Sequence, residues 1–298
     1  MSDALRHLKD SFEDPQADGR PLALWLWNGD LHEAQIGRQI REFAAKGMGG
    51  VVVRASLGLR TPYLDTRWWE TIGYAVRAAR DSGISIWIGD DYRTPSGSAG
   101  DPGSTDGPAA SRVLALGPEH RGKALTRSVV DVTGPVEVQL EGRYPAGDPL
   151  THVAGRVDSK HGLDPKSLTD LTDSLTWECP EGHWKIFSFA VRPVDDRVDY
   201  LRAETVARFV ETTYEPYVER FGNDIAGFSF DSPHLTSDPI PWTESLPTQF
   251  AELKGYDLLP LLPMLVVRAG PETTKLRCDF YDTLATLYTD SWFAQISS

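Results

Sequence analysis

Cysteine is scarce in this sequence, with Cys179 and Cys278 the only two among 298 residues. Neither belongs to a Cys-x-x-Cys pair or a Cys/His cluster, so the sequence offers no structural zinc site, and a chain of this length builds a core without disulfides. It also lacks an apolar run of membrane-spanning length, and its polar first 20 residues lack the apolar centre of a signal peptide. We therefore expect a cytoplasmic protein stabilised by its hydrophobic core.

Clusters of lysine and arginine are also missing, and the formal net charge is −13. Because binding to nucleic acid or to an anionic membrane needs clustered positive charge, we expect neither as a partner. The glycine-rich segment 95–107 lacks the residue order of a P-loop, and no GxGxxG follows the first predicted strand. We predict no cofactor; the many aspartates would suit a calcium ion, but nothing in their spacing supports one.

What is present is an alternation of apolar runs and amphipathic helical patterns. Strands are predicted at 22–27, 50–59 and 84–89, with helical spacing of apolar residues between them. This order is typical of a parallel sheet covered by helices, whose strands are buried on both faces. A fourth strand of the same kind is predicted at 225–233, after a long helix.

Between these parts, the pattern becomes one of short β-like runs separated by Gly, Pro and Asp, which predicts an antiparallel insertion. We therefore divide the chain into residues 1–108 (barrel-type βα units), 109–199 (an inserted β-rich subdomain) and 200–298 (a further βα unit with C-terminal helices). The predicted fold class is α/β, with TIM-barrel-type units in a partial or split barrel, because only four barrel-type strands are present. We expect a second polypeptide to complete the barrel, with homo-oligomerisation as the alternative.

Polar side chains follow the predicted strands, and in a parallel sheet these strand ends meet on the side where active sites gather. Paired carboxylates there suit proton transfer, since burial and mutual repulsion separate their pKa values. Asp91 and Asp231 are therefore predicted as catalytic. The predicted substrate-binding residues are Asn28, Asp30, Arg54, Asp90, Tyr92, Arg93, Ser232, His234 and Trp242.

Each of these residues also has a structural interpretation. Adjacent aspartates point in opposite directions on an extended chain, and Asp readily caps a loop backbone, so Asp90 and Asp91 could organise a turn. His234 could be a solvated loop residue, and Arg54 could neutralise Asp90 or Asp91 instead of binding an anionic substrate group.

Several motifs resemble the α-L-rhamnosidase-like glycoside hydrolases (glycoside hydrolase family 106 and relatives). The similar segments are WLWNGDL, GVVVRASLGLRTPYLDTRWW, GDDYRTPSGSAG, DYLRAETVARF and PWTESLPTQFAELKGYDLLPLLP. The resemblance implies a (β/α)8 catalytic barrel with β-rich insertions. In those relatives the third strand ends in Asp-Glu and the fourth in Asp-Glu-Pro, whereas this sequence has Asp90-Asp91 and Asp231-Ser232-Pro233.

Three functions follow as hypotheses. The first is an enzyme on a repurposed glycosidase-like scaffold, in which carboxylates assist elimination or ring closure on a polar small metabolite in a biosynthetic pathway, since a lost carboxylate removes proton-transfer capacity. The second is a glycoside hydrolase acting on rhamnose-like sugars. The third is a non-catalytic carbohydrate-binding or scaffold subunit of a heteromeric complex.

Overall fold

The computed structural model describes residues 3–92, 95–100, 111–158, 162–231, 233, 235 and 239–297. Contacts between residues divide the chain into two compact units. The first comprises 1–120, 196–198 and 207–234, and the second comprises 121–195, 199–206 and 235–298. The predicted β-rich segment and the C-terminal helices thus share one unit, and whether the three predicted segments are separate domains stays a prediction.

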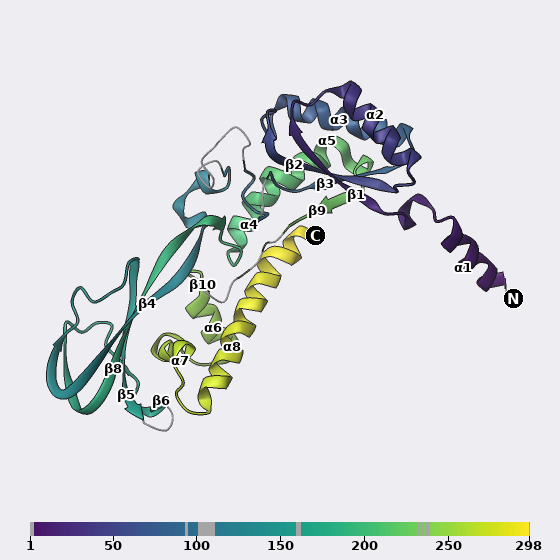
Figure 1. Cartoon of the computed structure of the whole chain (residues 1–298). Coiled ribbons are helices and arrows are strands. Elements are labelled where there is room, and N and C mark those ends of the chain that lie inside the picture. The colour runs from purple at the N-terminus through teal and green to yellow at the C-terminus, as the bar shows by residue number, and fades with distance from the viewer. Residues whose placement is uncertain are drawn as a thin grey trace. The chain divides into compact units, whose positions relative to one another are not determined.

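The first unit contains the predicted parallel sheet, which has four strands in the order β1-β2-β3-β9 (Figure 1). Its strands are β1 (Leu22–Gly29), β2 (Gly50–Leu59), β3 (Ser85–Gly89) and β9 (Gly227–Ser229). Its helices are α1 (Asp3–Glu13), α2 (Glu33–Ala45), α3 (Thr66–Asp81) and α5 (Glu215–Phe221). The sheet places the ends of β3 and β9 side by side, with Gly89 in register with Ser229.

Strand β1 is buried on one face only, which corrects the prediction of a strand buried on both. Trp25 and Trp27 are buried on the face that packs with the helices, whereas Leu22, Leu24 and Leu26 alternate with them and remain exposed. Leu24 is 59 % exposed. A continuous apolar run does not reveal which face a neighbouring layer will cover, because side chains of a strand alternate between faces.

Aromatic residues fill the core of this unit. Trp68 is fully buried, packs edge-on against Trp27 and Tyr63, and donates a hydrogen bond from Nε1 to the Tyr217 hydroxyl at 2.7 Å. Tyr63 in turn donates to the backbone carbonyl of Asp90 at 3.2 Å. The core therefore holds in place the backbone at the end of β3.

The second unit contains a curled antiparallel sheet in the order β10-β4-β8-β5-β6, with β7 paired to β5. Its strands are β4 (Arg121–Gln139), β5 (Asp148–Asp158), β6 (Gly162–Leu163), β7 (Thr169–Asp170), β8 (Thr176–Val198) and β10 (Ile240–Trp242). The predicted antiparallel strands are thus confirmed. Strands β4 and β8 are longer than the predicted short runs, and β10 joins them from outside the predicted segment.

Helices of the C-terminal third pack with this sheet around one hydrophobic core. They are α6 (Leu246–Lys254), α7 (Pro263–Val266), α8 (Glu272–Tyr288) and α9 (Ala294–Ser297), and α4 (Ala203–Phe209) precedes them in the chain. Phe187, Phe250, Leu262 and Phe280 are fully buried in that core. Within the described residues, no helix is both long and apolar enough to cross a membrane.

Candidate active site at the strand ends

Asp90 follows β3 directly and is buried, with 1 % of its surface exposed. Its carboxyl accepts hydrogen bonds from the Ser96 hydroxyl at 2.6 Å and from the Tyr214 hydroxyl at 2.7 Å. Burial, followed by the charge of Asp91, raises the pKa of Asp90 to about 7, against the hydrogen bonds that lower it. Asp90 therefore exchanges a proton near neutral pH.

Asp91 is fully buried and accepts six hydrogen bonds, the largest number of any carboxyl group in the described part of the chain. Five come from backbone N–H groups and one from the Ser98 hydroxyl; the backbone donors are Tyr92, Gly97, Ser98, Ala99 and Gly100. Burial raises the pKa of Asp91, whereas these donors lower it. Burial is the largest of these effects, so the pKa of Asp91 is raised overall. Six donors favour the charged form of Asp91 and two favour that of Asp90, whose pKa the charge of Asp91 raises further.

This arrangement assigns Asp91 to the organisation of the loop that follows β3. Its carboxylate lies inside a ring of N–H donors and is not exposed to a substrate. Ala99 adopts a left-handed backbone angle, φ 51°, which the hydrogen bond from its own N–H to Asp91 stabilises. The predicted catalytic role of Asp91 stays a prediction, and its geometry favours the structural alternative.

Ser96 connects the ends of β3 and β9. Its hydroxyl donates to Asp90 and accepts from the Asp231 backbone N–H at 2.8 Å, while its own N–H donates to the Asp231 carbonyl at 2.9 Å. The structure thus brings Asp90 and Asp231 together as predicted from the parallel sheet, through a serine that the sequence analysis did not select. Its position in a glycine-rich loop gave no separate signal.

Arg54, on β2, forms an ion pair and hydrogen bond with the Asp231 carboxylate. The Arg54 side chain is 14 % exposed and that of Asp231 is 40 % exposed, so Asp231 is the carboxylate of this cluster that reaches solvent. Gly89 makes room for the arginine, because a Cβ at this position would lie 2.9 Å from Arg54 Cγ. Of the two sequence interpretations of Arg54, the geometry supports neutralisation of an aspartate, with Asp231 as its partner.

Tyr214 was missed by sequence analysis, although it donates directly to Asp90. It ends a single π-helical turn, Val210–Tyr214, between α4 and α5. Pro216 has no N–H to donate to the preceding turn of the helix, and the Glu215 N–H bonds to the carbonyl of Val210. The proline therefore gives a local reason for the π turn. Burial and then the charge of Asp90 raise the pKa of Tyr214, which keeps it a hydroxyl donor.

Asn28 and Asp30 lie at the end of β1, beside a small cavity of about 70 Å³. Asn28 is exposed, and Asp30 pairs with Arg60 at 3.0 Å on an exposed surface. The same cavity is lined by Trp27, whose buried Nε1 has no hydrogen-bond partner within the described residues. Neither Asn28 nor Asp30 has a hydrogen bond to the Asp90–Asp231 cluster among the described contacts, so their substrate-binding role stays a prediction.

The remaining predicted residues divide into buried ones and ones outside the described part. Tyr92 is buried, 5 % exposed, and contributes a backbone N–H to Asp91. Trp242 is 3 % exposed in the core of the second unit, where it packs with apolar residues and has no open ring face for a substrate. Arg93, Ser232 and His234 lie outside the described residues. No group of three or more His, Cys, Asp or Glu residues suited to a metal ion occurs in the part of the chain that the structure describes.

Comparison with known proteins identifies the scaffold. The sequence model of glycoside hydrolase family 106, alpha-L-rhamnosidase, matches residues 144–298, just over half of the chain. The chain belongs to this family. The matched segment contains Tyr214, Asp231 and Trp242, whereas Arg54, Asp90 and Asp91 precede it.

A solved structure of a rhamnosidase from Novosphingobium sp. PP1Y has a similar fold. The match has a TM-score of 0.60 at 16 % identity and covers 95 % of this chain and 45 % of that rhamnosidase. This chain therefore spans less than half the length of that relative, and at this identity the similarity concerns the fold alone. No curated protein matches the sequence. The rhamnosidase family thus provides a glycosidase-type scaffold for the strand-end cluster.

Proposed function

We propose that the chain is an enzyme on this rhamnosidase-family scaffold, in which Asp231 acts on a polar small metabolite in a biosynthetic pathway. The observation that carries the proposal is the partly exposed Asp231 carboxylate, paired with Arg54 and connected through Ser96 to Asp90. Arg54 favours the charged form of Asp231, so this group is available as a general base or as a stabiliser of developing positive charge. Buried Asp90 positions Ser96 and does not contact the substrate.

The reaction class that suits one exposed carboxylate is elimination or ring closure assisted by a base. In an elimination, Asp231 takes a proton from the carbon beside the one that bears the leaving oxygen. The C–H electron pair forms the new double bond, the C–O bond breaks with its electron pair, and water protonates the leaving oxygen. Conventional acetal hydrolysis needs two carboxyl groups on either side of the bond, about 5–10 Å apart. Asp90 and Asp91 are too buried to supply the second.

A second candidate is hydrolysis of a rhamnose-like glycoside, which the family match favours. A third is carbohydrate binding without catalysis, which the enclosure of Asp91 favours. The three candidates predict different outcomes when an aryl α-L-rhamnoside is mixed with the protein. A hydrolase releases the phenol, a binding protein retains the intact glycoside, and the proposed enzyme does not hydrolyse it.

The experiment compares Asp231→Asn with Asp224→Asn as the matched control, since Asp224 also pairs with an arginine, Arg80 at 3.5 Å, on an exposed surface. Turnover would be followed by mass spectrometry on metabolites extracted from the source organism. We expect loss of at least about 100-fold in the Asp231 variant, as for removal of a general base, and none in the control. Equal activity in both variants, or phenol release that depends on Asp231, would reject the elimination proposal.

For the fold, we propose that the parallel sheet is part of a TIM-barrel-type arrangement completed by further βα units on a second polypeptide. The exposed leucine row on β1, Leu22, Leu24 and Leu26, supports this, because the corresponding face of a closed barrel is its packed interior. Co-purification of the untagged protein with light scattering would detect a stoichiometric partner, and Leu24→Glu is expected to release it. A homo-oligomer disrupted by the same change would indicate self-association, and a monomer unaffected by it would reject both.

A further inference from the structure

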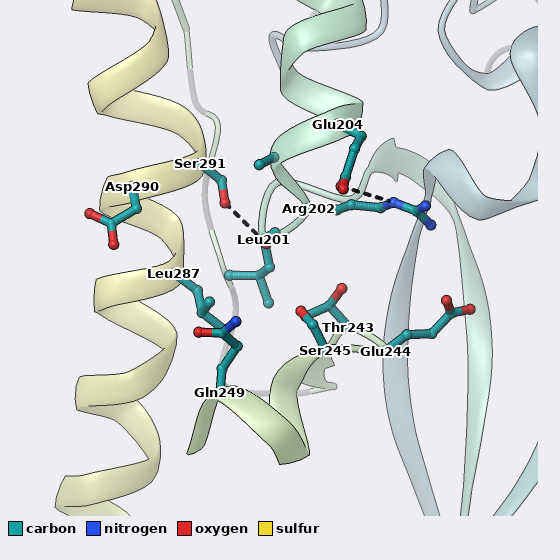
Figure 2. Close-up of a pocket in the computed structure, with 11 residues that line it drawn as sticks. Leu201, Arg202, Glu204, Thr243, Glu244, Ser245, Gln249, Leu287, Asp290 and Ser291 are labelled. Carbon is teal, nitrogen blue, oxygen red and sulfur yellow. Dashed lines mark hydrogen bonds and ion pairs between the residues drawn. The ribbon is translucent and has the colours of Figure 1, made fainter. Parts of the chain in front are cut away.

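The second unit contains a pocket of about 440 Å³ that the strand-end cluster does not use. Three segments line it, at the start of α4, around the junction of β10 and α6, and at the end of α8 (Figure 2). This volume lies in the range of small-molecule sites and accommodates one or two sugar rings. All of its lining residues belong to one compact unit.

Hydrogen bonds inside the unit fix the inner wall of the pocket. Asp199 is 3 % exposed and accepts from the Thr243 hydroxyl at 2.8 Å and from the Leu201 N–H at 3.0 Å. The Ser291 hydroxyl donates to the Leu201 carbonyl at 3.1 Å, and Figure 2 shows this bond joining the helix to the segment before α4. Thr243 and Ser291 are both buried, and each hydroxyl donates its proton to another group of the protein. These bonds fix the two hydroxyl oxygens, whose lone pairs are then available to accept hydrogen bonds from a ligand.

A π-helical turn contributes to the same wall. Residues Thr289–Phe293 form a π turn that continues α8, and Ser291 lies within it. Such turns shift the helix face by one residue and recur at functional sites, because they direct a side chain that a regular helix would place elsewhere.

The charged residues around the pocket are largely neutralised by one another. Arg202 pairs with Glu204 at 3.4 Å, and Glu244 pairs with Lys123. Figure 2 shows Asp290 directed away from the other lining side chains. The charges therefore give no strong preference for an anion or a cation.

Uncharged polar groups remain for a ligand. The Ser245 hydroxyl makes no cap to its own helix, and the Gln249 amide has no hydrogen-bond partner within the described residues. Together with Thr243 and Ser291 they offer both donors and acceptors, while Leu201 and Leu287 add an apolar surface. This combination matches a sugar, whose hydroxyls both donate and accept and whose ring carries C–H groups on its faces.

We propose that this pocket binds a neutral polyhydroxylated molecule, either a monosaccharide or the end of an oligosaccharide. The proposal concerns a second site and does not depend on the chemistry of Asp231. Ser245 and Gln249 provide the hydrogen bonds, and the Asp199–Thr243–Leu201 network positions the wall opposite the π turn.

Saturation-transfer NMR on the whole chain would test it with L-rhamnose, D-galactose and lactose, with putrescine and inorganic phosphate as charged probes. We expect signals from the sugars and not from the charged probes. The double variant Ser245→Ala/Gln249→Ala should lower affinity about tenfold, since it removes two side chains that form hydrogen bonds with the ligand. Thr248→Ala, an exposed change on the same helix outside the pocket, is the matched control.

Asp231→Asn separates this site from the strand-end cluster, because it should leave the sugar signals unchanged. Stronger signals from lactose than from the monosaccharides would assign the ligand as an oligosaccharide end, and the reverse would assign a free sugar. Sugar signals that persist in the double variant, binding of putrescine or phosphate in their place, or no binding at all would overturn the proposal. If the double variant does not fold, Ser245→Ala alone serves, since this hydroxyl supports no helix cap.

Discussion

In each compact unit a buried aspartate with a raised pKa, Asp90 in the first and Asp199 in the second, lies beside a π-helical turn, yet the two surroundings differ. Asp90 accepts from two hydroxyl groups and lies next to a second carboxylate, and its pKa rises to about 7. Asp199 accepts from one hydroxyl and one backbone N–H, and burial raises its pKa to about 6 while the charges of Lys123 and Arg202 oppose the rise. Burial sets the direction in both units, and the hydrogen bonds and neighbouring charges decide how far the pKa moves.

The largest expected effect comes from removing Asp91, the neighbouring carboxylate that distinguishes the surroundings of Asp90 from those of Asp199. Asp91→Ala deletes the carboxylate that raises the pKa of Asp90 and leaves its buried N–H donors without a partner. We expect the free energy of unfolding to fall by about 3–5 kcal/mol, because each buried unsatisfied donor costs about 1–3 kcal/mol and the loop relaxes in part. Urea unfolding monitored by tryptophan fluorescence would measure it, with Asp224→Asn as the control. A loss below 1 kcal/mol would contradict the structural role of Asp91.

Asp90→Asn should remove a pH dependence from the first unit. An unfolded aspartate titrates near pH 4, so between about pH 4 and pH 7 the folded state retains a proton that the unfolded state releases. Stability therefore falls as pH rises through this window, by up to about 4 kcal/mol for a pKa that moves to about 7. In the variant the free energy of unfolding should change far less between pH 5 and pH 8. An unchanged slope would mean that Asp90 is ionised in the folded state.

Asp199→Asn gives the corresponding result for the second unit, with a smaller magnitude. Its pKa of about 6 predicts a decline in stability between about pH 4 and pH 6, of up to about 3 kcal/mol. The variant should lose this contribution between pH 4 and pH 6, while the decline between about pH 6 and pH 7, which comes from Asp90, stays. If Asp199→Asn also flattens the range between pH 6 and pH 7, the proposed contrast between the two surroundings is wrong.

The smallest expected effect comes from the exposed pair at the end of β1. Arg60→Gln breaks its ion pair with Asp30, both side chains being more than half exposed. We expect a change in the free energy of unfolding within about 0.5 kcal/mol, because solvent screens such pairs. A thermal melt checks this. A larger loss would indicate that Asp30 belongs to the organised part of the strand-end site.

Much of the first unit was accessible from sequence because its signals are local. The alternation of apolar runs with helical spacing predicted β1, β2, β3 and β9 in a parallel sheet, and that sheet placed Asp90 and Asp231 together. The antiparallel strands were predicted in kind but not in length, since turn residues such as Gly134 and Pro135 lie inside β4 without ending it. A partial barrel leaves one face of its sheet open, but the apolar run of β1 did not show which of its faces that is, because the sequence of a strand does not state what covers it.

The sequence by itself determined the parallel sheet, the position of the aspartates at its strand ends and the resemblance to the rhamnosidase family. Only the tertiary structure decided what each aspartate does. Asp90 and Asp91 are chemically identical neighbours, but one faces hydroxyl groups of Ser96 and Tyr214 and the other faces a ring of backbone N–H donors. The Tyr214 hydroxyl lies 124 residues from Asp90 in the sequence, and the N–H donors to Asp91 depend on the exact path of a loop. Neither feature is encoded in the local pattern of residues. The same holds for the second pocket, whose polar wall is assembled from three separate segments.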